Sequence, residues 1–290
     1  MKIAIFGNIY RDIILTHIER LFEHFKSGDV TFLLDNELHQ YIKTQGKCCT
    51  EHTCTIENDE FEADIVLSIG GDGTFLNTAA RVGRKQIPII GINIGRLGFL
   101  ADIPGENMIP AMEAILAKRY ELEERSLLYV EASDGTVFDY PYALNEVAVL
   151  KQDSSSLLTV HTRINGENVH SYQADGLLVS TPTGSTAYSL SVGGPIVVPS
   201  SQNFILSPIA SHSLSVRPLI IPDNWAVELD VNSRSHCYLI AIDGRSQVLE
   251  EKTKLKITKA DYSIKVIKQL NHTFFDTLKN KLMWGVDKRN

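Results

Sequence analysis

One segment, ADIVLSIGGDGTFLNTAARV at residues 63–82, joins an apolar run to a helix-like pattern through three glycines and one aspartate. Such a pattern predicts a buried strand whose chain turns tightly into a helix. In an open α/β sheet, ligands bind in the loops at the carboxyl ends of parallel strands. The segment therefore favours a fold of strand–loop–helix units and marks its own loop as a candidate site.

The first part of the chain, residues 1–122, repeats this alternation of strands and helices. Alternation of this kind indicates a parallel sheet with flanking helices, that is, an α/β domain. The strands are expected at residues 2–7, 30–35, 64–69 and 87–93, and the helices at 14–25, from about Thr74, and at 107–118.

The second part, residues 123–269, contains alternating and β-branched segments instead, which predict a mostly antiparallel β domain. Asp134-Gly135 and Asn165-Gly166 lie between such segments and predict two-residue hairpin turns. The tail at 270–290 contains an amphipathic pattern, so we expect a C-terminal helix that packs back on the α/β domain.

Composition limits the classes of partner. The 290 residues are 43% hydrophobic and carry a net charge of -7 without a long basic run, which argues against a nucleic-acid partner. The N-terminal MKIAIFG contains too few apolar residues for the core of a signal peptide. No run of 18 apolar residues, the length typical of a transmembrane helix, occurs in the sequence. We expect a cytoplasmic protein without a membrane partner.

A cluster of metal-ligand residue types occurs in KCCTEHTC, which contains Cys48, Cys49, His52 and Cys54. A zinc site needs a second ligand pair at a suitable spacing, and Cys237, the fourth cysteine, is far away in the sequence. We therefore expect a reduced surface loop, and the sequence identifies no metal ligands.

The loop GGDGT combines features that suit a phosphate with one that opposes it. Glycines let the backbone approach a phosphate closely, and the first amides of a helix starting at Thr74 favour its oxygens. Asp72 would repel the same phosphate unless Mg²⁺ bridges them or the carboxylate faces a hydroxyl group, whose proton it can accept. An ordinary strand-to-helix turn remains the alternative. The expected phosphate-binding residues are Gly70, Gly71, Gly73 and Thr74.

A second segment, DGLLVSTPTGSTAYSLSVGGPIVVP at 175–199, places small polar residues after a probable strand and suits a nucleotide. We expect a short helix from about Ser185 and Tyr188 in the core, with stacking on a base as the alternative. Asn145-Glu146 is either a polar strand end or a clamp for ribose and base. The hydroxyl donors, without positive charge, are Thr183, Ser185, Thr186, Ser189 and Ser191.

Six motifs in order resemble those of the NAD kinase family, and the resemblance spans nearly the whole chain. GGDGT alone is shared with diacylglycerol and sphingosine lipid kinases and resembles an element of 6-phosphofructokinases, whereas TPTGSTAYSLS is more specific. The motifs are GGDGTFLN (70–77), GINIGRLGFLAD (91–102), LNEV (144–147), the segment 175–199, HSLSVRPLI (212–220) and DG (243–244).

The resemblance implies a two-domain fold and transfer of the ATP γ-phosphoryl group to the 2′-hydroxyl of the adenosine ribose of NAD. It implies Asp72 as proton acceptor, a divalent cation such as Mg²⁺, and a homodimer or homotetramer. The NAD-binding residues carried over are Asp72, Gly73, Phe99, Asn145, Glu146, Asp175, Thr183, Thr186, Ala187, Tyr188, Ser189, Leu190 and Ser191.

Three positions depart from the family pattern: Leu100, where some members have Tyr; Gln173, where some have a basic residue; and Arg245, where Gln is frequent. These departures affect which phosphoryl donor, ATP or polyphosphate, we expect the chain to use, and whether we expect it to act on NAD or NADH. Two rival functions stay open, a lipid kinase of the diacylglycerol kinase type and a non-catalytic nucleotide sensor.

Overall fold

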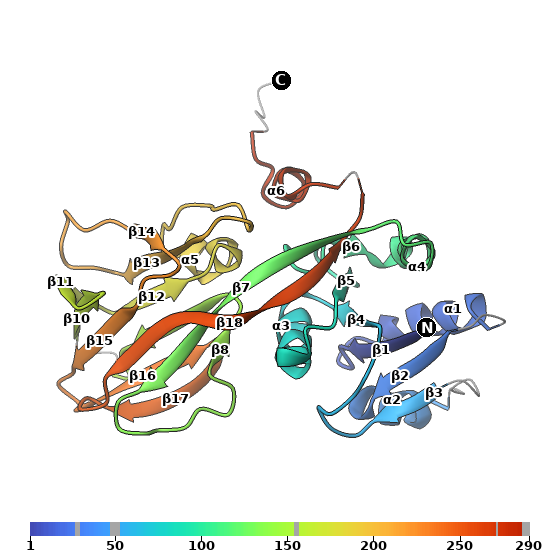
Figure 1. Cartoon of the computed structure of the whole chain (residues 1–290), viewed down its shortest axis with the longest axis horizontal. Coiled ribbons are helices and arrows are strands. Elements are labelled where there is room, and N and C mark those ends of the chain that lie inside the picture. Colours follow the sequence, from blue (N-terminus) through green and yellow to red (C-terminus); the bar gives the residue numbers. More distant parts are fainter. Residues whose placement is uncertain (27–29, 47–52, 154–156, 271, 286–290) are drawn as a thin grey trace. The chain divides into compact units, whose positions relative to one another are not determined.

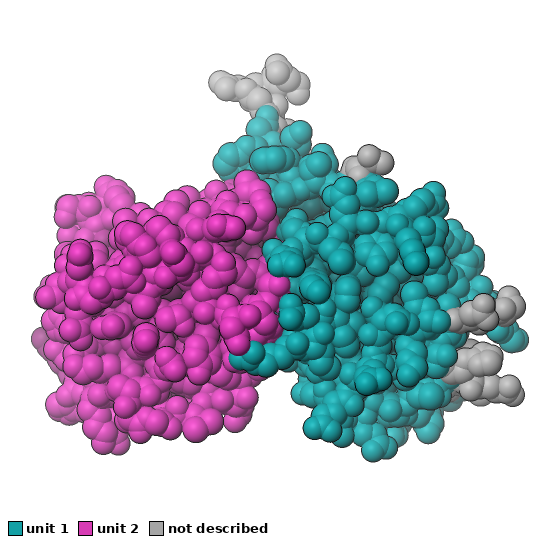
Figure 2. Space-filling view, viewed as in Figure 1, with its two compact units in different colours: residues 1–124, 264–290 teal, residues 125–263 magenta. Residues whose placement is uncertain are grey.

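The computed structural model describes residues 1–26, 30–46, 53–153, 157–270 and 272–285 (Figure 1). Its backbone contacts divide the chain into two compact units, which Figure 2 colours separately. Unit 1 comprises Met1–Glu124 and Ile264–Asn290, and unit 2 comprises Arg125–Ser263. The divisions fall within two long strands, β7 (Glu121–Ala132) and β18 (Leu255–Lys268).

Unit 1 contains a parallel sheet in the order β6-β5-β4-β1-β2-β3, which confirms the α/β prediction. The end of β18 joins it, because Val266 pairs in parallel with Ile89. The central strand β4 is buried along its whole length, as its continuous apolar sequence predicts. The strands are β1 (Lys2–Gly7), β2 (Thr31–Asp35), β3 (Thr53–Ile56), β4 (Ile65–Gly70), β5 (Ile89–Asn93) and β6 (Ile103–Pro104).

The helices of unit 1 bury apolar stripes. In the first of them, Ile14, Ile18, Leu21 and Phe22 recur at helical spacing and are all buried, so this face packs into the core of the unit. The helices are α1 (Ile13–His24), α2 (Asn36–Thr44), α3 (Asp72–Val82), α4 (Met108–Leu116) and α6 (Phe274–Leu282), with 3₁₀ turns at Gly83–Lys85 and Gly105–Asn107.

Unit 2 consists of two antiparallel groups of strands, which confirms the predicted β domain. One sheet has the order β14-β13-β12-β9-β16-β17, and the other group contains β11, β10, β15, β18, β7 and β8. Its strands besides β7 and β18 are β8 (Tyr142–Ala143), β9 (Glu146–Leu150), β10 (Leu158–Ile164), β11 (Glu167–Ala174), β12 (Gly176–Ser180), β13 (Asn203–Ile209), β14 (Leu219–Pro222), β15 (Val227–Asn232), β16 (Cys237–Ile242) and β17 (Arg245–Glu250).

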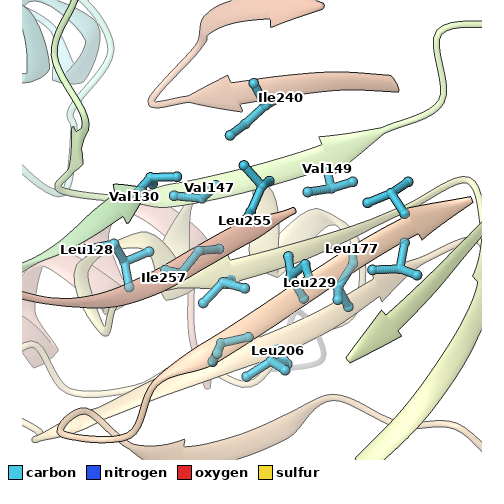
Figure 3. Packing of buried hydrophobic residues seen from close by; sticks show 14 of the residues in the cluster. Leu128, Val130, Val147, Val149, Leu177, Leu206, Leu229, Ile240, Leu255 and Ile257 are labelled. Carbon is cyan, nitrogen blue, oxygen red and sulfur yellow. The ribbon is translucent and has the colours of Figure 1, made fainter. Parts of the chain in front are cut away.

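The core of unit 2 lies between these two groups of strands. Val147 and Leu177 come from one sheet, and Val130, Leu229 and Ile257 from the other group; all five are 1% exposed or less (Figure 3). Burying one such aliphatic side chain contributes about 1.5–3 kcal/mol. This two-sided core fixes the strand ends from which the polar loops of the unit emerge.

The two expected hairpin turns have different outcomes. Asn165 and Gly166 both have positive φ and join β10 to β11, so the predicted two-residue turn is confirmed. The turn expected at Asp134-Gly135 is wrong, because a longer loop separates β7 from β8 and Asp134 instead binds the hydroxyl groups of Thr136 and Thr253. A third two-residue turn, which the sequence analysis did not predict, lies at Asp243-Gly244 between β16 and β17.

In the part of the chain that the structure describes, no helix combines the length and the apolar character needed to cross a bilayer. Cys48, Cys49 and His52 of the cysteine cluster lie outside the described residues. Cys54 is a free, exposed cysteine in β3, so at this position the expected loop is wrong because the chain continues the parallel sheet.

Candidate functional site

The GGDGT loop connects β4 to α3 at the carboxyl end of the parallel sheet. The helix begins at Asp72, two residues earlier than the expected start at Thr74, because Gly71 is extended and its carbonyl accepts the amide of Phe75 at 3.0 Å. Thr74 lies inside the first turn, where its hydroxyl accepts the Gly71 amide at 3.5 Å. A negative side chain at the first helical position is favoured by the helix dipole.

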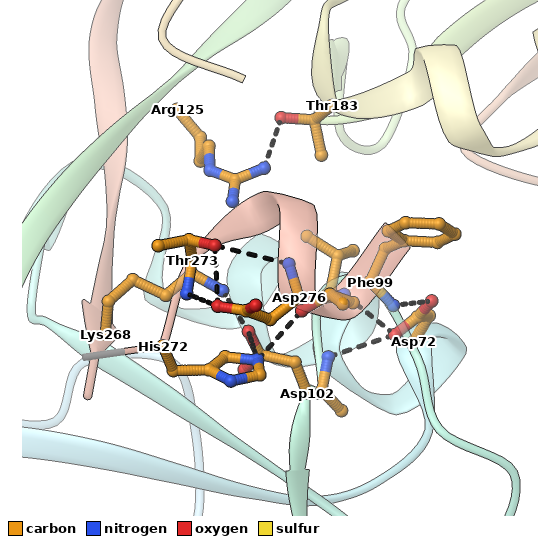
Figure 4. Close-up of polar contacts among 12 residues, drawn as sticks. Asp72, Phe99, Asp102, Arg125, Thr183, Lys268, His272, Thr273 and Asp276 are labelled. Atoms are coloured by element: carbon orange, nitrogen blue, oxygen red, sulfur yellow. Dashed lines mark hydrogen bonds and ion pairs between the residues drawn. The ribbon is translucent and has the colours of Figure 1, made fainter. Parts of the chain in front are cut away.

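The Asp72 carboxylate binds three consecutive backbone amides of the GRLGFLAD motif (Figure 4). Its Oδ2 accepts the amide of Phe99 at 2.9 Å, and its Oδ1 accepts those of Leu100 and Ala101 at 3.0 Å each. A carboxylate offers about four lone-pair positions, and these amides use about three of them. Asp72 is thus held in place by the backbone of the loop.

The loop that Asp72 binds is fixed at both ends. Asn93, at the end of β5, donates its amide to the carbonyl of Arg96 at 2.7 Å and accepts the amide of Gly95 at 2.7 Å. At the other end, Asp102 forms a 2.6 Å ion pair with Lys268 of β18, and both side chains are largely buried (Figure 4). These contacts hold the backbone amides at the distance from α3 that the carboxylate requires.

The glycines of GGDGT differ in what surrounds them. A side chain at Gly70 would collide with Thr74, whereas at Gly71 and Gly73 a Cβ atom would meet nothing within 4 Å. Neither Gly71 nor Gly73 has positive φ, so the backbone conformation does not require glycine there. Open space beside the first amides of an 11-residue helix suits the close approach of a phosphate.

A lysine from the C-terminal helix reaches the same carboxylate. Nζ of Lys281 lies 3.4 Å from Oδ2 of Asp72 and 4.6 Å from the ring centroid of Phe99. Phe99 also packs on Phe274, with ring centroids 6.1 Å apart. The sequence pattern does not indicate this lysine, because 209 positions separate Lys281 from Asp72.

In unit 2, the polar segment after β12 forms a 3₁₀ turn at Thr183–Thr186 and then α5 (Tyr188–Ser191). A short helix was expected from about Ser185; the structure has a 3₁₀ turn at that position, and the α-helix starts three residues later, at Tyr188. Ser185 and Ser189 are fully buried, and their hydroxyl groups bind Pro182 and Ser207 within the protein. These hydroxyl groups hold the turn together, and their role as ligand donors stays a prediction.

The remaining residues of this segment lie nearer the surface of unit 2, with one exception. Thr183 is buried, and its hydroxyl accepts a hydrogen bond from Nη1 of the buried Arg125 at 3.1 Å (Figure 4). The sequence predicted a segment without positive charge, so Arg125 is a residue that it missed. Thr186, Ala187 and Leu190 are partly exposed, and Ser191 is exposed.

Asn145 and Glu146 lie beside this segment at the start of β9. The carbonyl of Asn145 accepts the amide of Thr181 at 2.9 Å, and a side chain at position 184 would collide with Asn145, which explains the glycine there. Asp243 then fixes the pair from the β16–β17 turn. Its carboxylate accepts the amides of residues 144, 145 and 146 at 2.6, 2.9 and 3.0 Å.

The carboxylate of Glu146 lies in an unusual environment. Burial, together with the negative charge of Asp243, raises the pKa of Glu146 to about 7. The backbone amide of Tyr188 opposes this shift by hydrogen bonding to the carboxylate. Oε2 of Glu146 is buried without a hydrogen-bond partner among the described residues, so a ligand hydroxyl would satisfy it.

Tyr188 is 39% exposed, so the expectation that it fills the core is wrong, and its ring is available for stacking.

Asp175 lies away from this group of residues. It precedes β12, whereas Glu146 pairs with Ser180 at the other end of that strand. The strand rises about 3.3 Å per residue, so Asp175 lies roughly 16 Å from this group along it. There it pairs with Lys151 at 2.6 Å.

Two domain models match the sequence: the ATP-NAD kinase N-terminal domain over residues 3–120 and the ATP-NAD kinase C-terminal domain over residues 144–269. Among curated relatives, an NAD kinase of Bacteroides fragilis is 51% identical over 289 residues, covering 100% of both chains. An NAD kinase of Flavobacterium johnsoniae is 41% identical over 298 residues, again with 100% coverage of both.

Solved structures show the same architecture. An NAD kinase from Archaeoglobus fulgidus in complex with ATP has a TM-score of 0.76 at 26% identity, over 98% of this chain and 99% of that one. Yeast NADH kinase complexed with NADH has a TM-score of 0.90 at 23% identity, over 99% of this chain and 89% of that one. With GGDGT, LNEV and TPTGSTAYSLS arranged as described, the chain belongs to the NAD kinase family of enzymes.

Proposed function

We propose that this chain transfers the γ-phosphoryl group of ATP to the 2′-hydroxyl of the adenosine ribose of NAD, giving NADP and ADP. The observation that carries the proposal is the Asp72 carboxylate, held by three amides at the open start of α3. The full-length identity to NAD kinases supports the reaction class. The ATP present in the Archaeoglobus structure supports ATP as the donor.

In this proposal Asp72 accepts the proton of the 2′-hydroxyl as the oxygen attacks phosphorus. General-base assistance contributes about 10²- to 10⁴-fold, whereas holding two reactants in line contributes roughly 7–11 kcal/mol. Positioning is therefore the larger effect. Hydrogen bonds from three backbone amides position the carboxylate itself. The open space at Gly71 and Gly73 leaves the helix amides accessible to a polyphosphate.

The proposal assigns NAD recognition largely to unit 2. Oε2 of Glu146, which has no hydrogen-bond partner among the described residues, would accept hydrogen bonds from the vicinal hydroxyls of a ribose. The side-chain amide of Asn145 would form hydrogen bonds with adenine. The exposed ring of Tyr188 would stack on a base. Phe99 and Gly73, which lie in unit 1, stay proposed NAD contacts. Asp175 stays a proposed contact for a more distant part of an extended dinucleotide.

The donor groups near the loop fit a magnesium ion only as part of a nucleotide complex. Within the described ranges, no three His, Cys, Asp or Glu side chains gather into a metal site. Magnesium in kinases is typically bound by one or two carboxylates, substrate phosphates and water. Asp72 is used by the loop amides and as the proton acceptor, so such an ion would be held chiefly by the nucleotide phosphates and water, and it would supply positive charge to the triphosphate.

The experiment is phosphoryl transfer by the purified chain with ATP and Mg²⁺, offering NAD and diacylglycerol in parallel. We expect NADP, read out with an NADP-specific dehydrogenase, and no labelled lipid. Labelled lipid without NADP would establish the lipid-kinase alternative, and NAD binding without any product would establish the sensor. We also propose that the protein is cytoplasmic and that it forms a homodimer or homotetramer. Sedimentation of the purified chain tests the oligomeric state.

A further inference from the structure

The C-terminal helix α6 brings a cation to the Asp72 carboxylate within unit 1. Lys281 forms an ion pair with Asp72 at 3.4 Å, and its ammonium group lies 4.6 Å from the centroid of the Phe99 ring. The backbone N–H of Phe99 itself donates a hydrogen bond to the Asp72 carboxylate, as described above. The lysine therefore contacts both the carboxylate and the residue whose amide holds it.

The helix that carries Lys281 is fixed where it begins. Thr273 and Asp276 form reciprocal hydrogen bonds, from the Thr273 amide to Oδ2 of Asp276 at 2.9 Å and from the Asp276 amide to the Thr273 hydroxyl at 3.2 Å (Figure 4). Such a capping box stabilises the first turn of a helix. The packing of Phe274 on Phe99 then fixes the side of α6 that faces the loop.

Stability alone does not account for this contact. Lys281 and Asp72 are each 31% exposed, and an ion pair of this exposure typically contributes about 0–1 kcal/mol. An ammonium group beside a carboxylate at the first residue of a helix is, however, well suited to a transferred phosphoryl group, whose transition state spreads negative charge over three oxygens.

We propose that Lys281 binds the phosphoryl group during transfer, an inference that rests on the proposed function. The 2′-oxygen forms a bond to the γ-phosphorus, the bond from that phosphorus to the β,γ-bridging oxygen breaks, and ADP leaves. The hydroxyl proton goes to Asp72, and Lys281 keeps its own proton. Lys281 contacts the γ-phosphate of bound ATP, and neutralising Asp72 in this way weakens the competing attraction, so that more of the Lys281 charge acts on the phosphoryl oxygens during transfer.

The test compares Lys281→Gln, Lys281→Arg and Lys279→Gln. Lys279 is a matched control because it is exposed on the same helix, and residues two apart do not share a face. We expect Lys281→Gln to lower kcat/KM for ATP about 100-fold, the size typical for loss of one transition-state donor. We expect Lys281→Arg to recover part of the loss and Lys279→Gln to match the unchanged chain.

Direct binding separates this inference from the proposed function. The dissociation constant for NAD should stay within about threefold in Lys281→Gln, while that for ATP should rise; both are measured by calorimetry at a temperature where the variant remains folded. Equal kcat/KM for the two Gln variants, or a loss confined to NAD binding, would overturn the role of Lys281. If the unchanged chain forms no NADP, the proposed function fails, and the ATP titration still decides whether Lys281 contacts the nucleotide.

Discussion

At the scale of single residues, two aspartates, one in each unit, hold a loop of their own unit in the same way. Asp72 accepts the amides of residues 99–101, and Asp243 accepts those of residues 144–146. Each carboxylate holds three consecutive backbone donors of a loop that is distant in sequence. A substitution at either position therefore changes the loop as well as the charge, which affects how variants must be interpreted.

We expect Asp72→Asn to lower kcat about 10²- to 10⁴-fold and to keep the NAD dissociation constant within a modest factor. The asparagine NH₂ group would also face a backbone N–H, so unfolding free energy should fall by about 1–3 kcal/mol. Steady-state kinetics and denaturant unfolding on the same sample separate the two effects. Unchanged turnover with a large loss of NAD affinity would assign Asp72 to binding instead.

Glu146 predicts a pH dependence of NAD binding. Its pKa is raised to about 7, so below that pH the carboxyl is protonated and offers fewer acceptor positions to ribose hydroxyls. The KM for NAD should therefore fall as the pH rises from 6 to 8, with a midpoint near 7. In Glu146→Gln this titration should be absent and the KM high throughout. A KM profile that is the same in both proteins would contradict the ribose-binding role.

At the scale of secondary-structure elements, the sequence predicts that helix α3 exists but not the residue at which it begins. The periodic apolar residues Phe75, Ala79 and Val82 follow the strand, so the sequence indicates both elements. The position of Asp72 in the first turn depended on Gly71 being extended, a backbone choice that glycine leaves open. That choice brings the carboxylate to the 99–101 amides.

The first turn of α3 offers a test in which stability and activity change in opposite directions. Glycine destabilises a helix relative to alanine, and at Gly73 a Cβ atom would meet nothing within 4 Å. We expect Gly73→Ala to raise the free energy of unfolding by up to about 1 kcal/mol and to lower kcat/KM for ATP, because the methyl group occupies space needed by the phosphate.

The matched control is Gly83→Ala at the other end of the same helix. Gly83 has φ of +50°, so alanine there is strained and should lower stability without changing kcat. Urea unfolding and ATP kinetics check both variants. Wild-type ATP kinetics in a stabilised Gly73→Ala protein would refute the proposed phosphate approach at this turn.

The segment after β12 shows what the composition of an element leaves undetermined. Hydroxyl groups at Ser185 and Ser189 were predicted to face a ligand, yet both are buried and bonded internally. Composition identifies a row of donors but not which of them a tight turn consumes for its own backbone. Tyr188 shows the converse, since a residue expected in the core is partly exposed beside Glu146.

At the scale of the whole molecule, the two units have separate cores of different architecture, a parallel α/β sheet and an antiparallel β sandwich. A ligand that binds only the folded chain raises its stability by about 2.7 kcal/mol at 100 times its dissociation constant. We therefore expect NAD to raise the melting temperature measured by calorimetry. A shift with diacylglycerol and none with NAD would contradict the NAD kinase assignment.

The sequence by itself determined the two kinds of domain, the strand before GGDGT and the hairpin at Asn165-Gly166, because hydrophobic periodicity and turn chemistry act between near neighbours in the chain. Only the tertiary structure decided that Asp243 holds Asn145 and Glu146, and that Lys281 reaches Asp72. Those contacts join residues 97 to 209 positions apart. No local pattern encodes them, since they exist only once sheets and helices have packed and brought their loops together.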